Sequence, residues 1–307
     1  MDEIIRAVAG GGFVSIAAIS SRGLTERAKN IHKASRVCTA ALGRVMAAAS
    51  VFGSAMKRDG ASVTVRVNGG GPIGTIIAVS DNLGNVRCCA GNPEIELPIR
   101  LDGKLDVGRA VGKNGTLTVI RDAVARKRDT NVISEHGGAV FNENEPYSGS
   151  TALVSGEIAE DFTAYLAESE QAGAACALGV LIGGDGIVRA AGGYIVSLLP
   201  DAPEDVIAAV ERNIAETGYV TSVLDGGSAE ELISRVMRGL EPKILSRDAV
   251  EYKCGCSRER VASALAGIGK KEREDIIAKG EDVEVTCRFC DAVYTFSPAE
   301  IKKISVN

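Results

Sequence analysis

Two closely spaced cysteine pairs near the carboxyl terminus are the residues in this sequence best suited to chemistry. Cys254 and Cys256 are separated by one glycine, Cys287 and Cys290 by two residues, and 30 residues lie between the pairs. Four thiolates at such spacing supply the soft, tetrahedral ligand set that Zn²⁺ prefers in structural sites. The sequence therefore predicts one zinc site formed by Cys254, Cys256, Cys287 and Cys290.

The spacing alone leaves several uses of these pairs open. The simplest is a structural zinc site that holds a small lobe together. A thioredoxin-like thiol oxidoreductase using Cys287 and Cys290 is the enzymatic alternative, although that chemistry places a helix after CxxC and a β-prone segment follows here at 292–296. A nucleic-acid-binding zinc ribbon needs a basic surface, whereas residues 250–301 contain eight Lys or Arg against ten Asp or Glu.

The remaining cysteines show no such grouping. Cys38, Cys88, Cys89 and Cys176 are scattered through the first two thirds of the chain. The chain begins with Met1-Asp2-Glu3, which is acidic where a secretory signal needs basic residues. We therefore expect a cytoplasmic protein with reduced thiols, in which these four cysteines serve as small core or surface residues.

Composition limits the classes of partner. The chain has 307 residues, of which 45% are hydrophobic and 24% charged, as is typical of soluble globular proteins. Its longest apolar run, 45–56, is far shorter than the ~20 residues needed to span a membrane, so we expect a core helix there. A net charge of −5 argues against binding to nucleic acids or anionic membranes.

The elements that must position the cysteines form a small carboxyl-terminal lobe. A helix is expected from Ser257, a second over 272–279, and a β-hairpin over 283–296 whose turn contains Cys287 and Cys290. Residues i and i+2 of a strand point to opposite faces, so the backbone must turn between Cys254 and Cys256, and Gly255 permits that turn.

The rest of the chain predicts an α+β fold. Period-2 patterns indicate strands at 13–19, 62–68, 73–79, 86–89, 116–120, 180–182 and 193–199, and their short connections favour largely antiparallel pairing. One helix is expected to start at Thr25 and to bury Ile31, Cys38 and Leu42 on one face. Together these elements indicate a mixed α/β amino-terminal domain.

Two amphipathic helices follow Pro203, and the second begins with a capping pattern at Ser228 and Glu231. Each is too short to be stable alone and must dock on a neighbouring domain or on a second copy. We therefore divide the chain into an amino-terminal domain (1–200), a helical linker (201–242) and a zinc-binding lobe (243–307).

No other pattern supports a catalytic site. The segment 108–114 has three residues between its glycines and Asn after its Lys, so it does not fit a phosphate-binding loop. His32 and His136 have no nucleophile placed near them by spacing and are expected to be ordinary surface residues. We assign no catalytic residue.

The cysteine region resembles that of a known family. The segment 250–260 (VEYKCGCSRER), followed by Cys287-Arg288-Phe289-Cys290 and the strand Tyr294-Thr295-Phe296, is similar to the zinc region of the 33-kilodalton chaperonins, a family of redox-regulated heat-shock holdases. The resemblance continues, in the same order, through five earlier motifs: Arg58-Asp59-Gly60, Gly69 to Pro72, Val111-Gly112, Tyr147-Ser148-Gly149 with Ser169-Glu170-Gln171, and Ala191-Gly192-Gly193.

This resemblance implies an ATP-independent molecular chaperone rather than an enzyme. It implies that the four cysteines bind one Zn²⁺ when reduced, and that oxidation forms the disulfides Cys254–Cys256 and Cys287–Cys290 and releases the metal. It also implies that the linker then unfolds, that unfolding client proteins bind, and that the active form is a homodimer. The nearby Lys253, Arg258, Arg260 and Arg288 could offset the negative charge of a zinc–thiolate complex.

Overall fold

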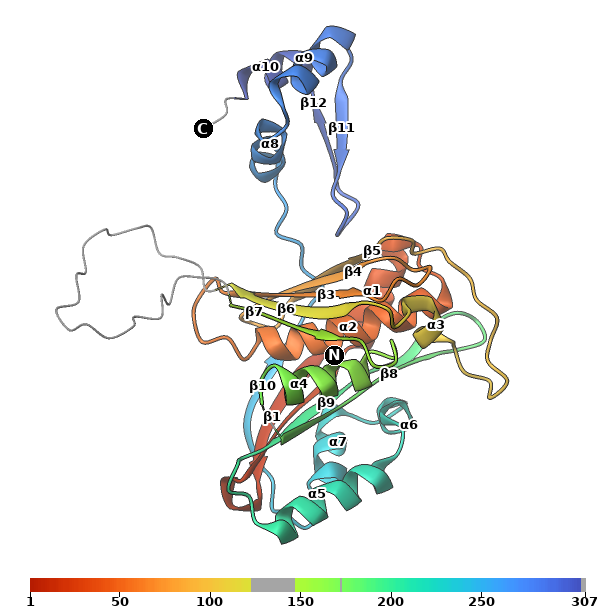
Figure 1. The fold of residues 1–307 in the computed structure, drawn as a ribbon, viewed down its shortest axis with the longest axis vertical. Helices are drawn as coiled ribbons and strands as arrows, with labels where there is room; N and C mark the ends of the chain where they lie inside the picture. Colours follow the sequence, from red (N-terminus) through yellow and green to blue (C-terminus); the bar gives the residue numbers. More distant parts are fainter. Residues whose placement is uncertain (123–146, 172, 305–307) are drawn as a thin grey trace, which may run out of the picture. The chain divides into compact units, whose positions relative to one another are not determined.

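The described part of the chain forms two compact units. The computed structural model describes residues 1–122, 147–171 and 173–304, and His136 lies outside them (Figure 1). Met1–Tyr252 form the first unit and Lys253–Asn307 the second. The functional division at residues 200 and 242 stays a prediction. Within the described ranges, no helix is long and apolar enough to cross a membrane.

The first unit contains two five-stranded antiparallel sheets, which agrees with the predicted fold class. The strand order is β10-β1-β2-β9-β8 in one sheet and β5-β4-β3-β6-β7 in the other. The first sheet consists of β1 (Glu3–Ala9), β2 (Val14–Ser20), β8 (Gly173–Ile182), β9 (Val188–Leu198) and β10 (Lys243–Ala249), with a 3-10 turn at Gly10–Gly12. The second consists of β3 (Ser62–Asn68), β4 (Ile76–Asp81), β5 (Val86–Ala90), β6 (Thr116–Asp122) and β7 (Tyr147–Ala152).

Alternating side chains explain the second sheet. Val63, Val65 and Val67 of β3 are fully buried, while the residues between them are less so. This period-2 pattern places one face against the core. The predicted hairpin is confirmed, since Val67 of β3 pairs with Ile76 of β4.

A buried helix lies between the two sheets (Figure 1). The prediction of one helix starting at Thr25 is wrong, because the chain forms α1 (Arg22–His32) and α2 (Arg36–Gly53). Lys33 takes a left-handed conformation (φ 48°) that ends α1, and the Ser35 hydroxyl then caps α2 by accepting a hydrogen bond from the Cys38 amide at 3.2 Å. The apolar spacing continues across this break, which is why the sequence pattern concealed it.

Almost every residue of α2 is buried, because the helix packs against both sheets. Short side chains allow this close contact, and Gly43 is an example: a Cβ there would approach Val180 Cγ2 to 2.7 Å. Phe52 of α2 also contacts Phe162, with ring centroids 5.6 Å apart. Two further helices complete this core, α3 (Val107–Val111) and α4 (Ala159–Glu168).

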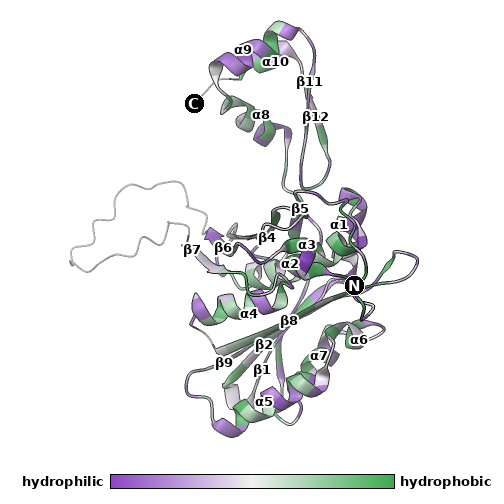
Figure 2. Cartoon of the chain, turned by 45° about the vertical axis from the view of Figure 1, so that its right-hand side comes forward, coloured by the Kyte–Doolittle hydropathy of each residue, from purple (hydrophilic) through white to green (hydrophobic). Residues whose placement is uncertain are grey.

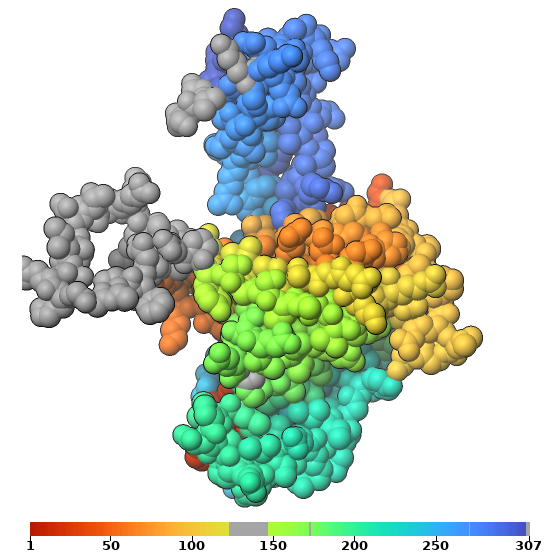
Figure 3. Space-filling model, in the orientation of Figure 1, coloured from red at the N-terminus to blue at the C-terminus, as the bar shows by residue number. Residues whose placement is uncertain are grey.

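The linker helices cover the opposite face of the first sheet. They are α5 (Glu204–Thr217), α6 (Val220–Leu224), which the sequence analysis did not predict, and α7 (Ala229–Val236). Their inward-facing residues share a buried apolar core with β1, β2 and β9. Figure 2 shows that α5 also carries hydrophilic residues. In the space-filling view of Figure 3, α5 packs against the rest of the first unit. The predicted docking on a neighbouring domain is therefore confirmed, and Ser228 caps α7 by accepting from the Glu231 amide at 3.2 Å.

The second unit is small. It contains α8 (Arg258–Ala266), α9 (Lys270–Lys279), the hairpin of β11 (Val283–Thr286) and β12 (Val293–Phe296), and α10 (Pro298–Lys303). Three apolar residues, Leu265, Phe296 and Ile301, form its buried centre, with partly buried neighbours around them. Such a core supplies little stability for a lobe of this size.

We predict that Asn213 of α5 holds the two longer linker helices together. Its buried side-chain amide donates hydrogen bonds to the carbonyl oxygens of Val236 (3.1 Å) and Arg238 (2.8 Å) at the carboxyl end of α7. Asn213→Ala leaves both carbonyls without this donor and should lower the free energy of unfolding by about 1–3 kcal/mol. Urea unfolding measures the loss, and Glu211→Ala, on the exposed side of the same helix, should change stability by less than about 0.5 kcal/mol.

Candidate metal centre

The four predicted cysteines lie together in the second unit. The sulfur atoms of Cys254, Cys256, Cys287 and Cys290 are all within 4.8 Å of one another. The Sγ atoms of Cys254 and Cys287 are 3.7 Å apart, and those of Cys256 and Cys290 are 3.4 Å apart. Four sulfurs placed about 2.3 Å from one tetrahedral Zn²⁺ would be separated by about 3.8 Å. The donor set and its dimensions therefore fit a metal ion.

Two hydrogen bonds fix the loop that carries the first pair. Arg260 Nη1 donates to the Gly255 carbonyl at 2.8 Å, and the Ser257 hydroxyl accepts from the Arg260 amide at 3.3 Å, which caps α8. The start of α8 therefore positions the segment between Cys254 and Cys256. A Cβ at Gly255 would meet only Arg260 Nη1, at 3.3 Å, so this glycine gives the guanidinium group space to approach.

The second pair lies in the turn of the predicted hairpin. The Cys287 amide donates to the Ala292 carbonyl at 2.9 Å, and the amides of Cys290 (3.3 Å) and Asp291 (2.9 Å) donate to the Cys287 carbonyl. Asp291 closes the turn with φ 58°, a conformation that Asp tolerates better than most residues. The β11–β12 pairing continues directly from this turn, so the hairpin sets the direction of both thiols.

A tyrosine on β12 contacts one of the sulfurs. The Tyr294 hydroxyl donates a hydrogen bond to Cys256 Sγ at 3.1 Å. This donation stabilises the thiolate and lowers the pKa of Cys256 to about 7, while it raises the pKa of Tyr294 to about 12. From the sequence, Tyr294 is predicted only as part of a strand. Its position four residues after Cys290, on the returning strand, was the available signal.

The nearby basic residues differ in their surroundings. Arg260 lies beside the first cysteine pair, as described above. Arg258 instead donates to Glu300 Oε1 at 2.6 Å and stacks on the Phe296 ring, 4.3 Å from its centroid. The Ser297 amide and the Arg258 guanidinium group lower the pKa of Glu300 to about 2. Arg258 therefore supports the lobe through the start of α10 rather than through the sulfurs.

The other cysteines are separate from this cluster. Burial raises the pKa of Cys38 to about 12, and it also raises the pKa values of Cys88 and Cys176. These three thiols are therefore protonated at neutral pH and are poor nucleophiles, as expected for core residues. Cys89 and Cys176 are half-buried, and all four are free thiols.

Within the ranges that the structure describes, the rejected candidates do not form a second site. Segment 108–114 contains the short helix α3 and the turn at Gly112, whose φ is 76°. A Cβ at Gly69 would come within 2.0 Å of the Gly112 carbonyl oxygen, so the glycines here allow two backbones to pack closely. His32 is half-buried, and its Nε2 lies 3.2 Å from the Tyr252 hydroxyl. The prediction that His32 is an ordinary surface residue is therefore wrong.

Comparison with known proteins gives consistent matches along the chain. A family model described as "Hsp33 protein" matches residues 2–297. A 33 kDa chaperonin of Clostridioides difficile is 44% identical over 304 residues, covering 99% of this chain and 98% of that protein, and one of Alkaliphilus metalliredigens is 37% identical, covering 98% and 97%. The crystal structure of the 33 kDa chaperonin of Thermotoga maritima matches with a TM-score of 0.85 and 30% identity, covering 99% of this chain and 97% of that one.

We predict that Tyr294→Phe weakens metal binding. Loss of the phenol donor raises the pKa of Cys256, so protons compete more strongly with the metal for that sulfur. The apparent affinity for Zn²⁺ should fall by about tenfold at pH 7, and the difference should narrow above pH 9, where the thiol is ionised in both proteins. Titration against a chromophoric chelator measures this, with Tyr147→Phe, a variant in an exposed residue of the first unit, as the control. Equal affinities at pH 7 would contradict the assigned role.

Proposed function

The chain belongs to the Hsp33 family, and on that basis we propose that it is an ATP-independent holdase chaperone activated by oxidation of zinc-bound cysteines. Its relatives are named chaperonins, and its four clustered cysteines are positioned to bind a metal ion. In the proposal the ion is Zn²⁺, and its ligands are Cys254, Cys256, Cys287 and Cys290. Bound Zn²⁺ would supply folding free energy to the lobe.

The proposal rests on two features of the second unit. Its four thiols are clustered, and its apolar core contains only three buried residues among those that the structure describes. A structural zinc site contributes on the order of 10–16 kcal/mol in small zinc-binding domains, which far exceeds what such a core provides. The lobe should therefore fold when its thiolates hold a metal and unfold when they no longer can.

Oxidation removes the ligands in pairs. Each pair of thiolates gives two electrons to one molecule of hydrogen peroxide, which takes up two protons from the solvent. The products are one disulfide and two molecules of water. In a tetrahedral cluster all sulfurs are nearly equidistant, so the folded geometry does not choose the pairs. We propose the pairs Cys254–Cys256 and Cys287–Cys290, which the resemblance to the family implies. The Cys287–Cys290 bridge should form first, because a ring closed over a single glycine is strained.

The linker helices provide apolar surface for clients. Val210, Leu232, Ile233 and Val236 are buried against the first sheet, and each represents about 1.5–3 kcal/mol of burial. If α5 and α7 detach after the lobe unfolds, both their inward faces and the sheet become accessible. Such a surface would bind unfolding client proteins and would also favour association of two copies, so we propose a homodimer in the oxidised state.

The first test compares reduced and oxidised protein. Peroxide should consume four thiols per chain, release one Zn²⁺ and switch on suppression of light scattering by a heat-unfolding client, without ATP. Peptide mapping of partly oxidised protein should find the Cys287–Cys290 bridge before the Cys254–Cys256 bridge.

Cys287→Ser should bind zinc weakly, whereas Cys89→Ser, outside the cluster, should bind zinc and respond to peroxide like the wild type. The proposed switch fails if reduced and oxidised wild-type proteins protect the client equally, or if Cys287→Ser keeps full zinc affinity.

The second test separates the linker from the metal. The double variant Leu232→Asp with Val236→Asp places two charges in the core and should detach α7, because burying unpaired carboxylates is strongly unfavourable. With zinc still bound, this variant should suppress client aggregation under reducing conditions, while hydrogen exchange shows an opened α7.

A matched control makes the same change of charge on the exposed side of α7, with Ser234→Asp and Arg235→Gln. It should behave like reduced wild-type protein. An opened α7 without any gain in client protection would show that the linker is not the client-binding switch.

A further inference from the structure

A short segment directly before the first cysteine pair completes the edge of the second sheet. We call residues 250–252 the strap. The Val250 amide donates to the Asp2 carbonyl at 3.1 Å, and its side chain is buried in the core of the first unit. Glu251 and Tyr252 lie along β5, where Val86 pairs with Tyr252 as a parallel bridge. Cys254 follows the strap after a single intervening residue.

β5 is an edge strand, and the strap bonds to outward-facing backbone groups of Val86 and Cys88. The Val86 amide donates to the Glu251 carbonyl at 3.0 Å. The Tyr252 hydroxyl accepts from the Cys88 amide at 3.3 Å and donates to the Cys88 carbonyl at 3.1 Å. An edge strand without such cover presents free amide and carbonyl groups that pair readily with any extended chain.

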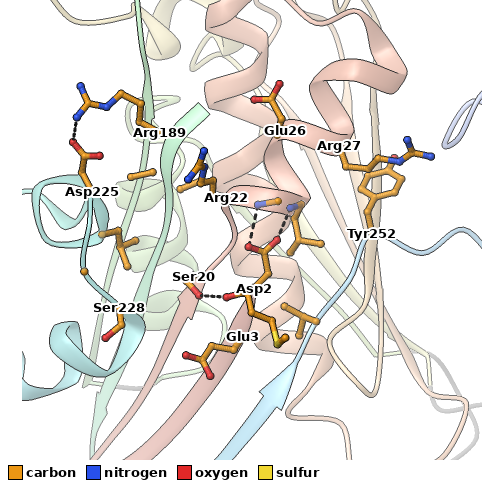
Figure 4. A pocket seen from close by; sticks show the side chains of 18 of the residues that line it. Asp2, Glu3, Ser20, Arg22, Glu26, Arg27, Arg189, Asp225, Ser228 and Tyr252 are labelled. Carbon is orange, nitrogen blue, oxygen red and sulfur yellow. Dashed lines mark hydrogen bonds and ion pairs between the residues drawn. The ribbon is translucent and has the colours of Figure 1, made fainter. Parts of the chain in front are cut away.

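Tyr252 is the main point of attachment. The Tyr252 hydroxyl donates to the Cys88 carbonyl, and His32 Nε2 lies 3.2 Å from the same hydroxyl oxygen. One phenol therefore joins α1, β5 and the strap. Its ring also packs against the core beneath the two sheets. Figure 4 shows Tyr252 at the side of an open groove of about 1140 Å³, where Asp2 also accepts hydrogen bonds from the Gly23 and Leu24 amides.

The groove itself does not indicate a small-molecule ligand. Its charged side chains are of both signs, and several are already paired: Arg189 with Asp225 at 2.6 Å, and Glu26 with the Val188 amide at 2.8 Å. The strap, in contrast, shows directly what fits the edge of β5, because it is itself an extended peptide bound there.

We propose that the strap is an internal substitute for a client. Tyr252 holds the strap on β5. When the strap is released, the edge of β5 at Val86 and Cys88 binds an extended segment of an unfolded polypeptide by strand addition. This inference rests on the proposed function, since unfolding of the following lobe is what would release the strap. The interaction uses backbone groups, so it is open to client segments of many sequences.

The first experiment tests the attachment in reduced, zinc-bound protein. Tyr252→Phe keeps the ring but loses all three hydroxyl contacts. Loss of a hydrogen bond shifts an opening equilibrium by about tenfold, so the Val86 amide, which is bonded to Glu251 and not to Tyr252, should exchange about tenfold faster. The Val65 amide, within β3, should be unchanged, and Tyr147→Phe should leave both unchanged. Acceleration confined to Cys88 would overturn the role of Tyr252 in holding the strap.

The second experiment tests client binding in oxidised wild-type protein. The Val86 and Cys88 amides should exchange rapidly in the free protein and slowly after addition of a reduced, carboxymethylated protein that cannot fold. If that client co-elutes with the chaperone while both amides remain fast, strand addition at β5 is wrong and the proposed function stands. If oxidised protein retains no client at all, the proposed function fails, and this inference fails with it.

Discussion

The small size of the carboxyl-terminal core is the constraint on which the rest of the molecule depends. Leu265, Phe296 and Ile301 are its only buried apolar residues within the part of the chain that the structure describes. A lobe with so small a core needs added stability, which cross-links or a metal commonly supply in small domains. The four cysteines, the hairpin turn that carries two of them and the capped start of α8 that positions the other two all meet this need. In the proposed function the lobe is held mainly through its sulfurs, and it is therefore sensitive to whatever reacts with sulfur.

The first unit has the opposite character. Its central helix is buried on nearly every side, and its two sheets are joined by a continuous apolar core. This part does not depend on the cysteine cluster for stability. The linker helices and the strap are intermediate, since the helices cover one face of the first sheet and the strap covers the outer edge of β5. We therefore expect local stability to decrease along the chain, from an amino-terminal unit with a large apolar core to a carboxyl-terminal unit with a small one.

Local patterns in the sequence predicted much of this arrangement. The cysteine spacing, the β-prone hairpin and the stripes of α5 and α7 are short-range signals, and the structure agrees with them. β10 was missed because most of its side chains are exposed, so only its pairing with β1, more than 230 residues earlier, defines it. The break between α1 and α2 was missed because apolar spacing runs through it. The hydroxyl contacts of Tyr252 and Tyr294 arise from tertiary placement, which composition and periodicity do not encode.

The side chains beneath the linker helices have a consequence for selectivity. On this face of the first sheet, small residues lie among larger ones, and Ala7, Ala9, Ala18 and Ala190 are all buried there. Methyl groups make a smooth surface without deep pockets, so such a face would distinguish poorly between one apolar side chain and another. Binding to it would depend on the area covered rather than on shape. A chaperone that must accept many different unfolded chains gains breadth from this low discrimination, at the expense of affinity for any one of them.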